Sequence, residues 1–270
     1  MAARIAHNVW IDPTAEIGED VSIGPFCSIG PRVKIGRGTR LEANVTLMSH
    51  VTLGENNHVF PGAVVGGWPQ DLSFSGADTW VRIGDGNIIR EGVTIHRASE
   101  KENMVTEIGS SCFLMAYAHV GHDCYLGDNV VMANNVMLGG HAHIHNNVTI
   151  AGGAAVHQFG SIGEFSFVGG NSAVRLDIPP FMLAEGNPAR PRCANLVGLR
   201  RNGFSEATIL QIGRARKLIY RDKVALENAR KQMEDSGPLA PEVSQYFDFI
   251  EFSRNGVNGR GREALRRKAA

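Results

Sequence analysis

Aliphatic residues recur at every sixth position through most of the first two thirds of the chain. The spacing holds without a slip over residues 5–65, resumes over 83–95, and holds again over 108–174. A helical period of about 3.6 residues cannot produce it. Because glycine, asparagine and other small residues stand between the aliphatic positions, the pattern predicts short strands joined by turns, with the aliphatic side chains directed into a narrow core.

One turn of such a chain cannot bury its own apolar side, so successive turns must stack, about 4.8 Å apart, into a solenoid. The segment IGEDVSIGPFCSIGPRVKIGRGTR (17–40) resembles the hexapeptide repeat of left-handed β-helix acyltransferases, in which three hexads form one triangular coil of eighteen residues. The expected fold class is therefore mainly β. We expect a left-handed parallel β-helix over residues 1–190, followed by a C-terminal α-helical domain over residues 191–270.

Two breaks in the six-residue register predict insertion loops at residues 66–82 and 97–107. Insertions in a solenoid form loops on one side, and such loops often bind ligands. The first break carries Trp68, Gln70 and Asp71. The repeat alone is also compatible with a scaffold or an ice-binding surface, but an ice-binding face needs a monotonous threonine row, which this sequence lacks. The breaks therefore favour a functional site on the loop side.

The hexads stop after Pro180, and the apolar spacing becomes helical. Ser205 is a candidate helix N-cap, and the apolar residues between it and Val224 share one helical face. Pro238 and Pro241 predict a break before a second helix. The last residues, GRGREALRRKAA (259–270), have the composition of a frayed, basic tail.

Charge is uneven along the chain, although the formal net charge is zero. Residues 1–190 hold 11 basic and 18 acidic side chains, whereas residues 191–270 hold 16 and 9. This asymmetry favours an acidic partner near the C-terminal part. The four cysteines form no CxxC pair, which indicates buried single thiols. No apolar run suits a signal or membrane-spanning segment, so we expect a cytoplasmic protein that is not an integral membrane protein.

Histidine is concentrated in one part of the chain, where six of the ten lie between residues 119 and 157. If one coil has eighteen residues, His122, Gly140 and Gln158 stack at one corner. A base, a backbone N–H left exposed by glycine and an amide would then converge, as acyl transfer requires. Asp123 could orient the imidazole, provided that the turn there brings both side chains to one face.

A metal site is the competing hypothesis for these histidines. A catalytic zinc needs three protein ligands and one open position. Two coils further on, however, the columns of His122 and His119 hold Gln158 and Ala155 rather than imidazoles. We therefore predict neither a metal nor another cofactor.

Longer motifs make the resemblance more specific, and it covers nearly the whole chain. The sequence resembles the family of UDP-N-acetylglucosamine acyltransferases, which begin lipid A biosynthesis. The segments that carry this resemblance are WPQDLSF (68–74), GVTIHRAS (92–99), AYAHVGHDC (116–124), LGGHAHI (138–144), AVHQFGSIG (155–163), VGGNSAV (168–174), AEGNPA (184–189) and ANLVGLRRNGFS (194–205).

The resemblance implies that an (R)-3-hydroxyacyl chain moves from acyl carrier protein to the 3-position of UDP-N-acetylglucosamine, without a metal or an acyl-enzyme. It also implies a homotrimer with active sites between subunits. His122 would be the general base, the Gly140 N–H would stabilise the oxyanion, and Asp123 would support the base. The substrate-binding residues that the resemblance implies are Gln70, Asp71, His96, His119, His141, His157, Gln158, Asn195 and Arg201.

Five further positions bear on specificity. Gly170 falls at the family's acyl-length ruler, where a glycine leaves the groove open to longer chains, and the nearby Phe167 could shorten it. Ser73 stands where a lysine is usual, while Val197 and Asn202 replace an expected acid and an expected arginine. These departures weaken the implied nucleotide contacts and leave open an acceptor with a 3-amino group.

Several basic residues gather at the start of the helical domain, and the resemblance favours them as a dock for the acidic acyl carrier protein. They are Arg200, Arg201, Arg214, Arg216, Lys217 and Arg221. Nucleic acid is disfavoured because no reader motif or set of stacking aromatics accompanies them. Two rival enzymes are a related UDP-sugar N-acyltransferase, which would carry an extra domain before its hexads, and a CoA-dependent acetyltransferase, for which no adenine site is apparent.

Overall fold

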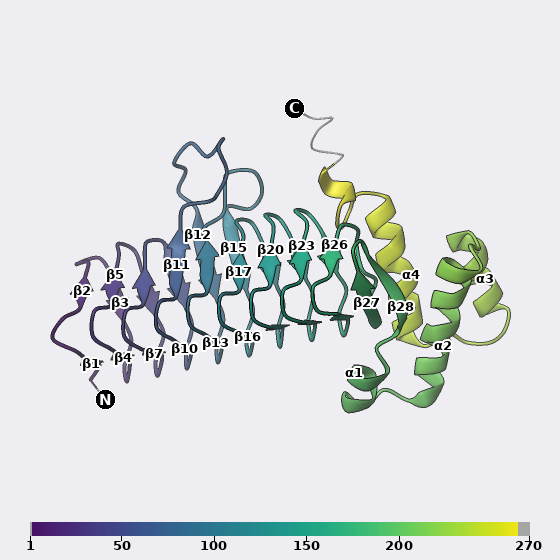
Figure 1. The fold of residues 1–270 in the computed structure, drawn as a ribbon, viewed down its shortest axis with the longest axis horizontal. Helices are drawn as coiled ribbons and strands as arrows, with labels where there is room; N and C mark the ends of the chain where they lie inside the picture. Colours follow the sequence, from purple (N-terminus) through teal and green to yellow (C-terminus); the bar gives the residue numbers. More distant parts are fainter. Residues whose placement is uncertain (1, 264–270) are drawn as a thin grey trace.

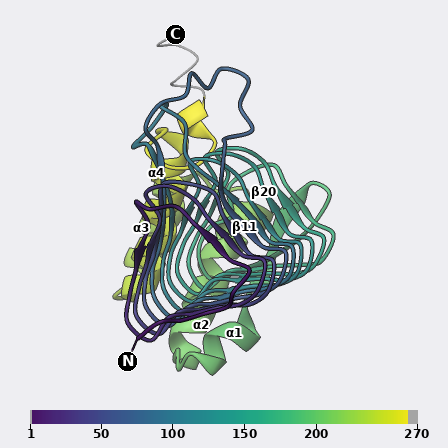
Figure 2. The ribbon, with the colours of Figure 1, turned by 90° about the vertical axis from the view of Figure 1, so that its left-hand side faces the viewer.

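The structure is a computed structural model that describes residues 2–263. Its first two thirds form a left-handed parallel β-helix of three sheets, and a helical region follows at one end (Figure 1). Viewed close to the solenoid axis, the coils lie over one another as nested triangular outlines (Figure 2). The predicted fold class is confirmed.

Each sheet takes one short strand from each coil. The eleven-stranded sheet holds, in spatial order, β1 (Arg4–Ile5), β4 (Ser22–Ile23), β7 (Arg40–Leu41), β10 (His58–Val59), β13 (Ile88–Ile89), β16 (Phe113–Leu114), β19 (Val131–Met132), β22 (Thr149–Ile150), β25 (Phe167–Val168), β27 (Met182–Gly186) and β28 (Ala189–Ala194). The nine-stranded sheet holds β2 (Trp10–Ile11), β5 (Ser28–Ile29), β8 (Thr46–Leu47), β11 (Val64–Gly67), β14 (Thr94–His96), β17 (His119–Val120), β20 (Met137–Leu138), β23 (Ala155–Val156) and β26 (Ala173–Val174). The eight-stranded sheet holds β3 (Glu16–Ile17), β6 (Lys34–Ile35), β9 (Val51–Leu53), β12 (Trp80–Ile83), β15 (Val105–Ile108), β18 (Tyr125–Leu126), β21 (His143–Ile144) and β24 (Ser161–Ile162).

Residues eighteen apart pair across neighbouring coils, as the six-residue period predicts. His119 pairs with Met137, and Met137 pairs with Ala155, in parallel register. In a strand such as β17 the second residue, Val120, is fully buried, whereas the first faces outward. Many corners use a residue with positive φ, for example Asn135 at 59°. Asparagine tolerates this left-handed conformation better than most residues, which explains its frequency between the aliphatic positions.

The two breaks form adjacent loops on one edge of the solenoid (Figure 1). The first lies between β11 and β12, and the second lies between β14 and β15. The coil register resumes after the first loop, since Ile83 pairs with Leu53 of the preceding coil. The loops are joined by contacts of Lys101 with Asp71 and of Glu100 with Ser75. Both loops are therefore insertions that do not disturb the pairing of strands between neighbouring coils.

The helical region contains more elements than the sequence pattern indicated. Its helices are α1 (Leu196–Arg201), α2 (Glu206–Arg216), the π-helical turn η1 (Lys217–Arg221), α3 (Leu226–Glu234) and α4 (Pro241–Arg254). Ser205 caps α2 as predicted, and its hydroxyl accepts a hydrogen bond from the Thr208 N–H at 3.0 Å. The helix expected after Ser205 is confirmed over residues 206–221, but it ends before Val224, because Lys223 adopts a φ of 56°. The helices α1 and α3 were not predicted.

The junction between solenoid and helices is a β-hairpin. β27 continues the eleven-stranded sheet in parallel with β25, and β28 returns antiparallel to β27. The expected boundary at residue 190 therefore falls inside β28. Three cysteines, Cys27, Cys112 and Cys124, are buried as expected, whereas Cys193 on β28 is exposed, and all four are free thiols. Within residues 2–263, no helix is long and apolar enough to cross a membrane.

The chain after α4 turns back onto the solenoid, where it meets the corners of the last coils (Figures 1 and 2). The backbone N–H of Arg260 donates to the Asp177 carboxylate at 3.1 Å, and the Glu263 carboxylate is buried. The expectation of a frayed tail is therefore wrong for residues 259–263, because polar side chains of the coils bind them. The rest of that segment, residues 264–270, lies outside the described residues.

Candidate active site

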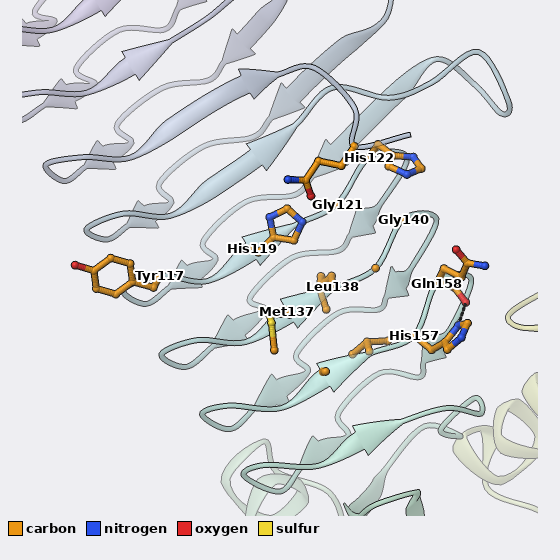
Figure 3. A pocket seen from close by; sticks show the side chains of 13 residues that line it. Tyr117, His119, Gly121, His122, Met137, Leu138, Gly140, His157 and Gln158 are labelled. Atoms are coloured by element: carbon orange, nitrogen blue, oxygen red, sulfur yellow. Dashed lines mark hydrogen bonds between the residues drawn. The ribbon is translucent and has the colours of Figure 1, made fainter. Parts of the chain in front are cut away.

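A cavity of about 810 Å³ lies on the outer face of the nine-stranded sheet, beside the two insertion loops. Side chains on β17, β20 and β23 form its floor, and His122, Gly140 and Gln158 stand at the coil corners along one side (Figure 3). The complete lining is Gln70, Tyr117, His119, Gly121, His122, Met137, Leu138, Gly139, Gly140, Ala155, Val156, His157 and Gln158. The predicted column of residues eighteen apart therefore faces one cavity.

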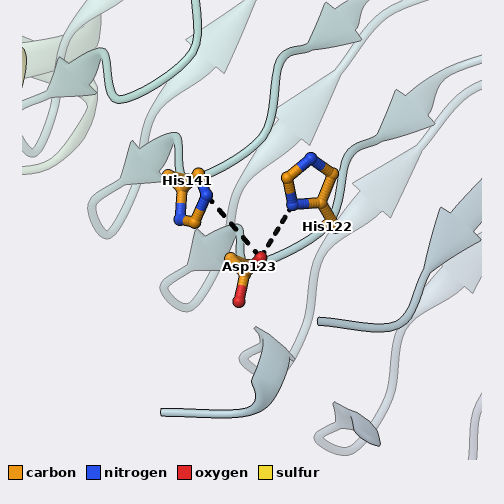
Figure 4. A group of neighbouring side chains, drawn as sticks. All are labelled: His122, Asp123 and His141. Carbon is orange, nitrogen blue, oxygen red and sulfur yellow. Dashed lines mark hydrogen bonds and ion pairs between the residues drawn. The ribbon is translucent and has the colours of Figure 1, made fainter. Parts of the chain in front are cut away.

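His122 and Asp123 form a hydrogen-bonded pair at the corner after β17. The His122 Nδ1 lies 2.7 Å from the Asp123 Oδ2, and the Asp123 side chain is fully buried (Figure 4). Consecutive side chains can meet here because Asp123 has a φ of 58°, which reverses the usual alternation. The turn on which the pairing depends is thus present.

The Asp123 carboxylate is held from behind by the second insertion loop. Its Oδ2 accepts hydrogen bonds from the Ser99 N–H at 3.0 Å and the Ser99 hydroxyl at 2.7 Å. Burial on its own raises the pKa of this carboxyl, but the hydrogen bonds from His122 and Ser99 outweigh it and leave the pKa below its ordinary value. Asp123 is therefore an anion at neutral pH. It fixes the proton of a neutral His122 on Nδ1 and leaves Nε2 as the basic atom.

Gly140 faces the His122 imidazole from the next coil. A Cβ on Gly140 would lie 2.5 Å from the His122 Cε1 and 2.6 Å from its Nε2, so no side chain fits between them. Among residues 2–263, no hydrogen-bond partner occupies the Gly140 N–H. The arrangement places an unblocked backbone donor beside the basic nitrogen, which is the pair of groups that a tetrahedral acyl-transfer intermediate needs.

His141 lies behind this pair rather than in the cavity. Its ring is buried, stacks on the Phe159 ring at a centroid distance of 4.3 Å, and places Nε2 3.7 Å from the Asp123 Oδ2. His122, Asp123 and His141 could each offer one metal-ligand atom within 4.8 Å of the others. The His141 imidazole does not appear in the column of His122, Gly140 and Gln158, because His141 follows Gly140 in the sequence. A comparison of residues eighteen apart therefore did not place it beside Asp123.

His96 and His119 stand together at the loop edge of the site, with their ring centroids 5.2 Å apart. The His119 Nδ1 lies 2.8 Å from the Thr94 Oγ1, and the His96 Nδ1 lies 2.6 Å from the Trp68 carbonyl oxygen. Burial lowers the pKa of both imidazoles, so both are neutral at pH 7. Neutral rings offer hydrogen bonds to a polar substrate without repelling a cation formed on His122.

The first insertion loop places Gln70 in the cavity wall and Asp71 just outside it. The Asp71 carboxylate accepts hydrogen bonds from the Ser73 N–H at 3.0 Å and from the Lys101 Nζ at 2.5 Å. Burial on its own would raise the pKa of Asp71, but these hydrogen bonds hold that pKa well below its usual range. Lys101 of the second loop thus supplies a cation next to Ser73, at the position where the sequence lacks the expected lysine.

Residues of the C-terminal segment reach the cavity wall, which sequence reasoning did not anticipate. The Gln158 Nε2 donates to the Glu263 Oε1 at 3.1 Å. Arg260 contacts the His157 Nδ1 and donates to the Gln158 carbonyl oxygen at 3.2 Å. No periodic signal joins residues 260–263 to residues 157 and 158, because the intervening helices decide where the segment returns.

Eight predicted site residues are not part of this lining. Asp71, His96, Asp123 and His141 adjoin it as described above, whereas the other four lie elsewhere on the chain. The Asn195 side chain caps α1, where its Oδ1 accepts from the Gly198 N–H and its Nδ2 donates to the Phe165 carbonyl oxygen. Arg201 is exposed at the end of α1, and Phe167 and Gly170 belong to a later coil. Within one chain the structure brings none of these four to His122.

Three family models match this chain in separate stretches. A model described as the second domain of UDP-N-acetylglucosamine O-acyltransferase matches residues 177–258, and the six-repeat bacterial transferase hexapeptide model matches residues 106–140. A model of the GMPPB C-terminal domain matches residues 5–105. Among these models, the one over the helical region is described as part of an O-acyltransferase, and one over the solenoid as a transferase hexapeptide repeat.

Complete relatives extend the likeness over nearly all of the chain. The acyl-[acyl-carrier-protein]–UDP-N-acetylglucosamine O-acyltransferase of Halorhodospira halophila is 42% identical over 254 residues, which cover 94% of this chain and 98% of that protein. The Gloeothece citriformis protein of the same name is 45% identical over 209 residues, 77% of this chain and 75% of its own.

Solved structures agree with these relatives. The structure of LpxA from Acinetobacter baumannii superposes with a TM-score of 0.89 at 40% identity, covering 92% of this chain and 97% of that one. The UDP-N-acetylglucosamine acyltransferase of Arabidopsis gives a TM-score of 0.81 at 34% identity, covering 92% and 96%.

A triangular β-helix whose corner sets a histidine–carboxylate pair against a bare backbone N–H defines a hexapeptide-repeat acyltransferase. The likeness to the Acinetobacter baumannii structure covers 92% of this chain, and the model of the second O-acyltransferase domain covers most of its helical region. The chain belongs to the acyl-carrier-protein-dependent UDP-N-acetylglucosamine O-acyltransferase family.

Proposed function

We propose that the protein transfers an (R)-3-hydroxyacyl chain from acyl carrier protein to the 3-hydroxyl of UDP-N-acetylglucosamine, the first step of lipid A biosynthesis. The observation that carries this proposal is the meeting of the His122–Asp123 pair with the Gly140 N–H at one wall of the cavity. The names of the similar enzymes supply the donor and the acceptor.

The geometry supports a direct transfer. The His122 Nε2 takes the proton of the 3-hydroxyl while that oxygen attacks the thioester carbonyl carbon, and the Gly140 N–H stabilises the resulting oxyanion. The intermediate then collapses, the C–S bond breaks, and the leaving thiolate takes the proton from the His122 imidazolium. The anionic Asp123 stabilises that imidazolium throughout. The products are the sugar ester and the free thiol of the carrier protein.

The cavity wall favours a hydroxyl over an amine as the acceptor. None of the lining residues within 2–263 is a carboxylate that would hold a 3-ammonium group. The amides of Gln70 and Gln158 and the neutral rings of His96 and His119 offer contacts to sugar hydroxyls instead. Lys101, set against Asp71, is our candidate for the diphosphate contact that Ser73 cannot make.

We also propose that the active protein is a homotrimer with its clefts between subunits. The cavity face exposes apolar side chains, since Tyr117 is 66% and Met137 49% accessible in the single chain. A second copy that covers this face would bury them and bring in groups from a neighbouring chain. Asn195 and Arg201, which stand away from the cavity of their own chain, are our candidates for such groups.

Two further parts of the proposal concern the donor. A Cβ on Gly170 would meet only the Gly152 carbonyl oxygen, at 3.4 Å, so this corner leaves room for the end of a long acyl chain. The exposed Arg214, Lys217 and Arg221 suit an acidic carrier protein. Their contribution would weaken as salt screens the attraction, so the KM for the carrier protein would rise with ionic strength.

One assay tests these choices together. Purified protein is offered UDP-N-acetylglucosamine or its 3-amino analogue with hydroxyacyl carrier proteins of graded length, in the presence of EDTA, and products are identified by mass spectrometry. We expect a 3-O-acyl product from the hydroxyl acceptor. A strong preference for the 3-amino analogue would show that the acceptor is an amine rather than a hydroxyl. Loss of activity with EDTA would contradict the metal-free mechanism.

Replacing the base gives the decisive variant. His122→Ala lowers kcat about a hundredfold or more, since general-base catalysis contributes that much, while the protein stays folded. His7→Ala, at an exposed position on the first coil, is the matched control and keeps wild-type turnover. An active His122→Ala protein would leave the proposed chemistry without its base.

A further inference from the structure

The back of the catalytic pair contains a second layer of charged groups. The buried His141 imidazole lies between two carboxylates, with Nε2 3.7 Å from the Asp123 Oδ2 and Nδ1 3.4 Å from the Glu102 Oε1. Glu102 belongs to the same insertion loop as Ser99, which donates two hydrogen bonds to Asp123. The second insertion loop therefore contributes both Ser99, which binds Asp123, and Glu102, which contacts His141 behind it.

Arg262, from the C-terminal segment, closes this layer. The Arg262 Nη1 lies 2.7 Å from the His143 Nε2 and 3.5 Å from the Glu102 Oε1, and the Arg262 Nη2 donates to the His141 carbonyl oxygen at 2.6 Å. The guanidinium carbon lies 5.7 Å from the centre of the Phe159 ring, on which His141 stacks. With 13% of its side chain exposed, Arg262 is nearly enclosed by the residues that it joins.

These contacts suit a guanidinium and no other side chain. Its donors form a rigid planar fork, so it can hold a carboxylate, an imidazole and a carbonyl oxygen at the same time. Burial, followed by the charge of Arg262, lowers the pKa of His143 to about 3, so this imidazole is neutral and accepts from Arg262. A lysine would keep the charge but could not span the partners.

We propose that Arg262 is a positioning residue for the acyl transfer. By binding Glu102 and the His141 turn, it holds the second insertion loop and the His141 ring against Asp123, and it thereby fixes the His122–Asp123 pair. The proposal rests on the proposed function for its chemistry, but the positioning can be measured without substrate. Arg260 and Glu263 make separate contacts with residues 157, 158 and 177, so the segment keeps other anchors when Arg262 is replaced.

The first test is kinetic and compares Arg262→Ala with Arg262→Lys. Because a small misplacement of a catalytic group can cost a hundredfold in rate, we expect kcat to fall about 10- to 100-fold in both, with the KM for the acceptor within about twofold of wild type. Added guanidinium ion should restore much of the kcat of Arg262→Ala. Arg254→Ala, at the exposed end of α4, is the matched control and should keep wild-type kcat.

The second test needs no turnover. Hydrogen exchange followed by mass spectrometry should show faster exchange in residues 97–104 and 140–145 of Arg262→Ala, but not of Arg254→Ala. Unchanged exchange and kcat, or a lost kcat that guanidinium ion does not restore, would overturn the positioning role. If exchange is faster in Arg262→Ala but the wild-type enzyme does not acylate UDP-N-acetylglucosamine, the proposed acceptor is wrong, whereas the positioning role of Arg262 is supported.

Discussion

The chemistry of the site depends on a backbone conformation at one residue. Asp123 follows His122 directly, and in an extended strand the two side chains would face opposite ways. The left-handed turn at Asp123 brings its carboxylate to the His122 Nδ1, while the Ser99 hydrogen bonds keep it ionised. Gly140 completes the arrangement by having no side chain to fill the space before the His122 Nε2.

We predict that Gly140→Ala inactivates the protein without unfolding it. The new methyl group would lie 2.5 Å from the His122 ring, so the imidazole must move away from its productive position. Steady-state kinetics should show kcat falling about a hundredfold. Gly213→Ala is the matched control, because a Cβ there meets nothing within 4 Å. Equal turnover in both variants would contradict the close approach of Gly140 to His122.

We also predict a contribution of His143 to acid sensitivity. Its pKa falls from 6.5 in the unfolded chain to about 3 in the fold, mainly through burial. Between these values the unfolded state binds the proton and the folded state does not, so stability is full above pH 6.5 and declines as the pH falls towards 3.

Urea unfolding at pH 7 and pH 5 measures this decline. His143→Gln should reduce the loss of unfolding free energy between the two pH values by about 1–2 kcal/mol, because glutamine does not titrate. Asn8→Gln, on the exposed first coil, replaces no titratable group and should leave the loss unchanged. If wild type, His143→Gln and the control lose the same unfolding free energy between pH 7 and pH 5, His143 does not take up its proton preferentially in the unfolded state.

At the scale of elements, the insertion loops convert a repetitive scaffold into a site. The strands supply a flat face with residues eighteen apart in line, but loops must provide Gln70 for the cavity wall and Ser99 for the buried carboxylate. The two loops also hold each other through Lys101 and Asp71. A charged contact next to Gln70 of the cavity wall thus comes from two loops that are separate in sequence.

Lys101→Ala should therefore weaken binding of the sugar nucleotide. We expect the KM for UDP-N-acetylglucosamine to rise about tenfold, the loss of one charge-assisted contact, while kcat changes little. Lys34→Ala, which removes an exposed lysine of an early coil, serves as the control in the same steady-state assay. A fall in kcat at constant KM would instead assign Lys101 to the support of the loop.

At the scale of the whole molecule, two observations on the single chain support the proposed trimer. The cavity has exposed apolar residues on its floor, and the predicted contacts Asn195 and Arg201 lie elsewhere on the chain. The proposed trimer would explain both observations, because a neighbouring chain would cover the face and supply the missing groups. The same chain can then carry the base of one cleft and part of the nucleotide site of the next.

Mixed trimers test this arrangement. Co-expressed His122→Ala and Arg201→Ala chains should regain activity, because about a quarter of the clefts in random trimers combine an intact His122 with an intact Arg201. The two variants prepared separately should be nearly inactive. Their mixture is compared with wild-type protein by initial rates and by light-scattering mass. A mixture as inactive as its components would place both groups in one chain.

Periodicity predicted the part of the fold that repeats. Stacking residues eighteen apart placed His122, Gly140 and Gln158 at one cavity, and the insertion breaks placed Gln70 beside them. The same reasoning missed His141 as a neighbour of Asp123 and overlooked α1, α3 and the docked segment 259–263. Those features have no period, and their positions depend on how the helical region packs on the last coils.

The sequence by itself determined the β-helix, because each hexad is a local unit and an aliphatic residue can be buried only by the coil that stacks on it. It also determined which residues share a corner. Only the tertiary structure decided that Asp123 turns towards His122, that Lys101 meets Asp71, and that Arg262 returns to His141. These contacts join segments that no repeat relates, so their geometry depends on turns, loops and helix packing rather than on a pattern along the chain.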